Sequence, residues 1–161
     1  FLGNNAINAE VSHLINELSA YIPNIDEKKM KIKKNWVLLK LQLIFGALAK
    51  STDINNYLNI KDDLIIGIER SFDINFLEES SSEFSSFNRY HKSYAHPDAN
   101  KVVVQGLTID FLFNNGLDQN NGINIGENEV IFNEVIAILL RKINHHLVET
   151  NKAIIKSIKI I

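Results

Sequence analysis

Arg141 and His146 are the two residues of this chain whose types and spacing best suit phosphodiester chemistry. Both fall late in a long apolar stretch between residues 127 and 149. An imidazole can take up or release a proton near neutral pH, and a guanidinium can hold a phosphate through two parallel hydrogen bonds. Five residues of helix turn by about 500°, so the two side chains would leave one helix roughly 140° apart. They would converge poorly within one copy, and a symmetric homodimer with facing helices would bring them together.

The same helix also has a purely structural interpretation. Arg141, His145 and Glu149 are spaced four residues apart, so they share one helix face and could form a solvent-exposed ladder of charges. In that case neither Arg141 nor His146 would meet a substrate. The sequence alone leaves both interpretations open.

A second basic segment lies between residues 88 and 97. Its basic side chains alternate with two tyrosines, and they are Arg89, His91, Lys92 and His96. Such a set could contact phosphates and stack on bases, so these four residues are candidates for an RNA- or phosphate-binding loop. The alternative is an ordinary surface loop, because connections are usually polar and exposed.

Five lysines crowd the segment from residue 28 to residue 34, just before Trp36. Lysines beside an aromatic ring could bind a nucleic-acid backbone. They also suit the solvated first turns of a buried helix, with Asp26, Glu27, Asp62 and Asp63 available to balance their charge. We favour the second interpretation.

Glu10 and His13 form a Glu-x-x-His pair on a predicted helix. Di-iron bundles use two such pairs and two further carboxylates. His145, His146 and Glu149 do not supply the second pair, so we predict no metal site and no cofactor.

The elements that must position these residues are predicted to be helices. Apolar residues at helical spacing indicate helices over residues 10–22, 54–60, 62–70 and 99–114, although residues 64–66 also fit a strand. A helix from Asp26 to Lys50 should be central, because residues 36–49 are apolar almost all round. Asn115 and Gly116 provide a C-cap signal, and a last long helix should begin near Glu127 and end near residue 150 or continue to residue 161. We predict an all-α fold, a single-domain helical bundle over residues 1–161 with about five or six helices.

Three parts of the chain together resemble the HEPN superfamily (higher eukaryotes and prokaryotes nucleotide-binding domains). They are the apolar helix of residues 37–50, the helix and Gly-Leu pair of residues 100–117, and Arg141 followed after four residues by His146. The chain departs from the usual motif at Lys142, where an asparagine is usual, and at His145, where a small residue is usual.

The resemblance implies a helical protein that acts on RNA. Similar members are often metal-independent ribonucleases of toxin–antitoxin and antiphage systems. By this resemblance, His146 is the general acid and base for the ribose 2′-hydroxyl or the leaving 5′-oxygen. Arg141 stabilises the charge of a phosphorane-like transition state. The implied partners are RNA and an antitoxin or other protein.

Composition limits the remaining classes of function. The net charge of −2 provides no overall field that favours nucleic acid or an anionic membrane, so any nucleic-acid contact must be a local patch. The absence of cysteine excludes disulfides, thiolate metal sites and a cysteine nucleophile, and fits a reducing compartment. No apolar run approaches the roughly 18–20 residues of a membrane span, and the first five residues lack the pattern of a signal peptide. We therefore expect a cytoplasmic protein that does not bind a membrane.

Two functional hypotheses follow. The first is an HEPN-like ribonuclease of a toxin–antitoxin or defence system, or an inactive relative of one. The second is a non-catalytic helical protein-interaction module, such as an antitoxin, immunity or effector-type domain. The position of Arg141 and His146, in a shared cleft or apart in solvent, bears on the choice between them.

Overall fold

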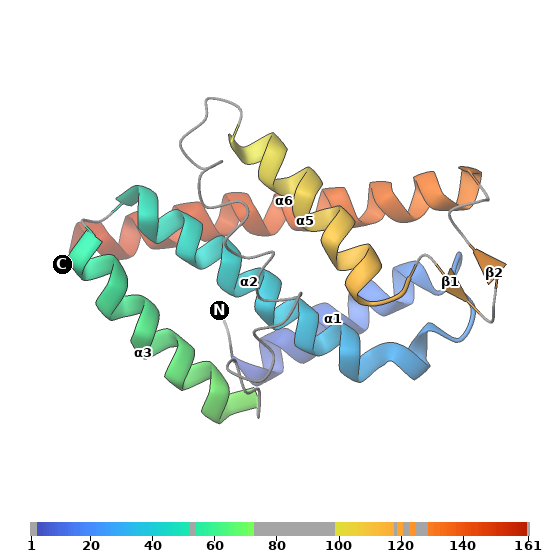
Figure 1. Cartoon of the computed structure of the whole chain (residues 1–161), viewed down its shortest axis with the longest axis horizontal. Helices are drawn as coiled ribbons and strands as arrows, with labels where there is room; N and C mark the ends of the chain where they lie inside the picture. The colour runs from blue at the N-terminus through green and yellow to red at the C-terminus, as the bar shows by residue number, and fades with distance from the viewer. Residues whose placement is uncertain are drawn as a thin grey trace.

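The computed structural model describes residues 3–51, 54–72, 99–117, 119–120, 123–124 and 129–160. Within these ranges, the elements in chain order are α1 (Asn4–Leu18), the 3-10 helix η1 (Ile25–Lys28), α2 (Lys29–Ser51), α3 (Ile54–Phe72), α5 (Ala99–Asn114), β1 (Gln119–Asn120), β2 (Ile123–Asn124) and α6 (Glu129–Ile160). Helices dominate, and β1 and β2 pair only as a short antiparallel ladder. The predicted all-α helical bundle is confirmed (Figure 1).

Helix α2 is the centre of the bundle, as its sequence predicts. It contacts α1, α3, α5 and α6 (Figure 1). Residues 35–48 are all buried, which explains why this stretch is largely apolar on every face. Trp36 and Phe45 are each only 1% exposed. One charged residue, Lys40, lies inside this apolar stretch and is fully buried.

Helix α6 is the longest element and crosses both α2 and α5. Its buried apolar residues recur at helical spacing, and they are Val135, Ile138, Leu139, Ile143 and Leu147. The stripe fixes which face of α6 meets the core, and therefore where Arg141 and His146 leave the helix. The helix continues past Thr150 to Ile160, the longer of the two predicted ends.

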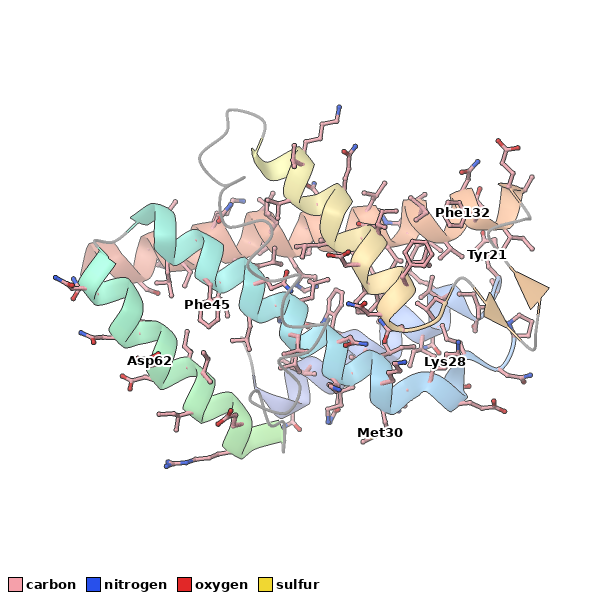
Figure 2. All side chains as sticks on the ribbon, in the orientation of Figure 1. Tyr21, Lys28, Met30, Phe45, Asp62 and Phe132 are labelled. Carbon is pink, nitrogen blue, oxygen red and sulfur yellow. The ribbon has the colours of Figure 1, made fainter. Side chains whose placement is uncertain are left out.

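The predicted extents of two helices, α1 and α3, were wrong. Helix α1 covers residues 4–18 instead of 10–22, because Ile7 is buried and extends the apolar stripe toward the N-terminus. At its other end, the amides of Tyr21 and Ile22 both donate to the Leu18 carbonyl, which closes a turn instead of continuing the helix. Helix α3 is a single helix where two helices or a strand were expected. Ile60, Leu64 and Ile65 pack against the core in one continuous stripe, so Asp62 interrupts nothing and lies exposed on the outer face of α3 (Figure 2).

The C-terminal end of α5 is held by the cap that the sequence predicts. Gly116 has φ +63°, its amide donates to the Phe113 carbonyl, and the Leu117 amide donates to the Leu112 carbonyl at 2.9 Å. These two bonds are those of a Schellman motif. Lys28 lies beside this end of α5 (Figure 2), and its ammonium donates to the Gly116 carbonyl.

Across the described ranges, no helix combines the length and the apolar character that crossing a membrane requires.

Candidate functional site

Arg141 and His146 line the same cleft within one chain. The cleft has a volume of about 550 Å³ and lies between α1, α2 and α6. Its lining residues are Glu10, His13, Glu17, Trp36, Arg141, Lys142, His145 and His146. We expected Arg141 and His146 to converge poorly within one copy, because that expectation was based on the geometry of α6 alone. Helices α1 and α2 complete the cleft, and the long arginine side chain reaches across to α1.

The geometry of α1 explains how its polar residues reach the cleft. Glu10, His13 and Glu17 recur at i, i+3 and i+7, so they share one helix face. Helices α1 and α6 run in opposite directions (Figure 1), so the earlier residue of α1 lies level with the later residue of α6. Glu17 therefore meets Arg141 and Lys142, whereas Glu10 lies beside the Trp36 ring that His146 contacts.

Glu17 is the meeting point of three nitrogen groups. Its Oε2 accepts a hydrogen bond from Arg141 Nη2 at 3.1 Å. Its Oε1 lies 3.1 Å from Lys142 Nζ and 3.1 Å from His13 Nε2. Partial burial raises the pKa of the Glu17 carboxyl, but the hydrogen bond and charge of Lys142, with the charges of Arg141 and His13, outweigh it and lower the pKa overall. Glu17 is therefore ionised at neutral pH.

Glu10 forms a second ion pair deeper in the cleft. Lys40 Nζ donates to both carboxylate oxygens of Glu10, at 2.9 and 3.0 Å, and the Trp36 indole N–H donates to Oε2 at 2.8 Å. The Lys40 side chain is fully buried, whereas the Glu10 side chain is 24% exposed. The pair therefore joins the interior of α2 to the wall of the cleft.

His146 lies at the inner side of the cleft and is partly buried. Its ring meets Trp36 edge-on, with centroids 5.2 Å apart and an interplanar angle of 84°. Desolvation by burial lowers the pKa of the imidazole. The negative charge of Glu10 raises that pKa, while the positive charges of Lys40, His145 and Lys142 lower it further. The net result is a pKa below the usual range, so His146 is neutral at neutral pH and able to accept a proton.

The Glu-x-x-His pair of α1 has other partners than a metal ion. Glu10 binds Lys40 and Trp36, whereas His13 lies against Glu17. In the part of the chain that the structure describes, no group of three or more His, Cys, Asp or Glu side chains is arranged to hold a metal ion.

The residues of the predicted charge ladder on α6 do not pair with one another. Arg141 pairs with Glu17 of α1, and Glu149 pairs with Lys152 at 3.7 Å. His145 packs its ring against His146, with centroids 5.5 Å apart. Arg141 is therefore directed toward the cleft and does not pair along its own helix.

The other predicted contact residues lie elsewhere. Arg89, His91, Lys92 and His96 fall outside the described residues. In the lysine-rich segment, Lys29 and Lys31 are exposed at the start of α2, which fits the solvated-turn interpretation, and Lys28 binds the end of α5.

Sequence reasoning missed the roles of Glu17, Lys142 and Lys40. The i, i+3, i+7 pattern of α1 was a usable signal, because it places Glu17 on the same helix face as Glu10 and His13. Only the Glu-x-x-His pair of Glu10 and His13 was considered from the sequence. The position of Lys40 was a second usable signal, because a single charged residue inside an apolar helix needs a partner when it is buried.

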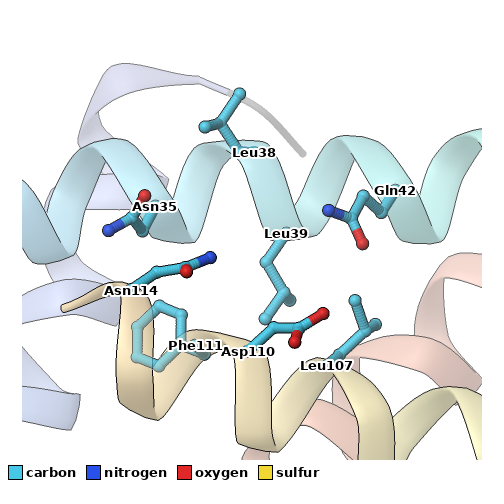
Figure 3. Close-up of a pocket in the computed structure, with 8 residues that line it drawn as sticks. All are labelled: Asn35, Leu38, Leu39, Gln42, Leu107, Asp110, Phe111 and Asn114. Atoms are coloured by element: carbon cyan, nitrogen blue, oxygen red, sulfur yellow. The ribbon is translucent and has the colours of Figure 1, made fainter. Parts of the chain in front are cut away.

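A second pocket lies between α2 and α5 and is too small to be a substrate site. Figure 3 shows its walls, which include Leu38, Leu39 and Phe111. Its volume of about 20 Å³ is room for little more than one water molecule. The cleft beside α1 is therefore the better candidate for binding a substrate.

Comparison of the chain with protein-family models, with curated proteins and with solved structures gave no match.

Proposed function

We propose that this protein is an HEPN-like, metal-independent ribonuclease whose active site is the cleft between α1, α2 and α6. The observation that carries the proposal is that Arg141 and His146 line one cleft in one chain. The resemblance of the sequence to the HEPN superfamily provides the chemistry. The same resemblance suggests a toxin–antitoxin or defence setting with an antitoxin or other protein partner. Cytoplasmic location and a homodimer remain predictions, and both residues line the cleft of a single copy.

The proposed reaction uses His146 as the base. Its neutral imidazole takes the proton of a ribose 2′-hydroxyl, and the resulting oxyanion attacks the adjacent phosphorus. Arg141 stabilises the added negative charge of the transition state. The imidazolium then protonates the leaving 5′-oxygen, which completes the cleavage. The lowered pKa of His146 supports the first of these steps, because it keeps the imidazole neutral at neutral pH.

Cleavage of a fluorogenic RNA substrate in the presence of EDTA tests the proposal. We expect Arg141→Ala and His146→Ala each to lower the rate by at least about a hundredfold, the usual scale of losing a charge-stabilising or acid–base group. Arg70→Ala is a matched control, because Arg70 is exposed on α3 outside the cleft. Circular dichroism would confirm that each variant keeps its helices. A wild-type protein without activity, or cleft variants as active as the control, would contradict the proposal.

An apolar stripe on α5 favours the second candidate function, a protein-interaction module. Val102, Ile109 and Phe113 are 40%, 40% and 55% exposed, and their spacing places them on one face. Under this alternative a protein partner binds the chain, and replacing Arg141 and His146 leaves the binding unchanged.

A further inference from the structure

The carboxylate of Glu17 occupies a place that suits a phosphate group. Arg141, Lys142 and His13 each bring a nitrogen to 3.1 Å from one of its two oxygens. A carboxylate and a phosphodiester both present two negatively charged oxygens, and the same donors bind both. The three groups are therefore arranged as an anion site with a side chain of the protein as its occupant.

Two of the three contacts to Glu17, those from Arg141 and His13, are open to solvent and can exchange readily. The side chains of Arg141 and His13 are both 68% exposed, and that of Glu17 is 28% exposed, whereas that of Lys142 is 16% exposed. Water and salt weaken ion pairs in such a setting, so a stronger or multivalent anion can compete for the same donors. The pair of Glu10 with the fully buried Lys40 is far better shielded from solvent.

The position of Lys142 links this anion site to His146. The two residues are four apart on α6, so their side chains leave adjacent turns of the same helix face. Both line the cleft. A phosphate held by Lys142 and Arg141 would therefore lie on the side of α6 from which the imidazole projects.

We propose that His13, Lys142 and Arg141 form the phosphate-binding site of the cleft, and that Glu17 fills this site in the free protein until the phosphate of an RNA substrate displaces it. This inference rests on the proposed function and deepens it. Lys142, at the position where the family usually has asparagine, is a substrate-binding residue under this proposal. Displacing Glu17 would leave a locally cationic surface on a chain whose net charge is −2.

RNA binding by Glu17→Gln provides the test, because the substitution keeps the shape of the side chain and removes its charge. The probe is a short 5′-fluorescein-labelled single-stranded RNA with 2′-O-methyl groups, which cannot be cleaved through its 2′-oxygen, and the readout is fluorescence anisotropy. We expect binding about tenfold tighter than that of wild type, with a steeper dependence on salt. Glu149→Gln is the matched control, because it removes the same charge from α6 outside the cleft. Equal tightening in both variants, or none in Glu17→Gln, would overturn the inference.

A double substitution tests whether Lys142 belongs to the site that becomes available when the charge of Glu17 is removed. Adding Lys142→Met to Glu17→Gln should remove most of the gain in affinity, because the phosphate then lacks one of its donors. A gain that survives this addition would show that Glu17 masks some other surface, and would overturn the assignment of Lys142.

A measurement on the wild-type protein keeps the inference testable if Glu17→Gln does not fold. Inorganic phosphate should shift the NMR signals of the His13 imidazole in a saturable manner, whereas chloride at equal ionic strength should not. Signals that respond equally to both salts would count against the site.

The outcomes of these experiments also distinguish the phosphate-site proposal from the ribonuclease proposal. Tighter binding by Glu17→Gln in a protein that cleaves no RNA would support the phosphate site and contradict the ribonuclease function. RNA cleavage by a protein whose Glu17→Gln variant binds no more tightly would support the ribonuclease function and contradict the phosphate site.

Discussion

The environment of His146 is set by Trp36, the only tryptophan of the chain. Trp36 is 1% exposed, donates to Glu10 and presents its ring edge-on to the imidazole. Apolar surroundings favour the neutral imidazole, and burial is the largest cause of the lowered pKa of His146. A histidine that acts first as a base must be neutral when the substrate arrives, so this environment suits the proposed role.

The contact between Trp36 and His146 allows the pKa of His146 to be measured by fluorescence. A protonated imidazole quenches an adjacent indole more strongly than a neutral one does. We therefore expect the Trp36 emission to fall as the pH is lowered, with a midpoint below about 6.5, the ordinary value for histidine. His146→Gln should abolish this transition, whereas His13→Gln should retain it, because His13 contacts Glu17 instead of the indole. A midpoint above about 6.5, or a transition that persists in His146→Gln, would contradict the assigned environment.

At the scale of the elements, the sequence predicts what local patterns determine. The bounds of α5 were predicted correctly, because its apolar spacing and the Asn115–Gly116 cap both lie within the segment. The division of α3 at Asp62 was wrong, because a capping residue is a weak signal beside an apolar stripe that continues through it. The ion pair between Glu17 and Arg141 joins residues 124 positions apart, so it depends on how α1 packs against α6. No local pattern contains that pairing, although the face that Glu10, His13 and Glu17 share on α1 can be read from the sequence.

The cap at the C-terminal end of α5 predicts that replacing Gly116 lowers the stability of the fold. The backbone there has φ +63°, which favours glycine, and an added Cβ would lie 3.3 Å from Lys28 Nζ. We expect Gly116→Ala to lower the free energy of unfolding by about 1–2 kcal/mol, measured by urea denaturation. Gly67→Ala is the matched control, because Gly67 lies exposed inside α3 with nothing within 4 Å of the added Cβ. The control should be more stable than wild type by about 0.5–1 kcal/mol. A shift of the same sign in both variants would contradict this account of the cap.

Across the whole molecule, the ion pair of Glu10 and Lys40 connects the core to the cleft. Lys40 extends from the central helix and is fully buried, and Glu10 extends from α1 to meet it. The same carboxylate accepts the Trp36 indole N–H, and its charge raises the pKa of His146 against the effect of burial. This one pair of residues therefore contributes both to the packing of α1 on α2 and to the protonation of the proposed base.

The unequal burial of this pair predicts an unequal cost of breaking it. Glu10→Gln would remove the carboxylate from a fully buried ammonium, so we expect a loss of about 3–5 kcal/mol in the free energy of unfolding. Lys40→Met should cost less, about 2 kcal/mol, because methionine preserves the packing of the lysine stem and the remaining carboxylate keeps its contact with solvent and with Trp36. The double substitution should cost less than the sum of the two single ones, because it leaves no buried charge behind. Urea denaturation followed by circular dichroism measures all three. Additive losses, or a larger loss for Lys40→Met than for Glu10→Gln, would show that this ion pair does not hold α1 against the centre of the bundle in the way its geometry indicates.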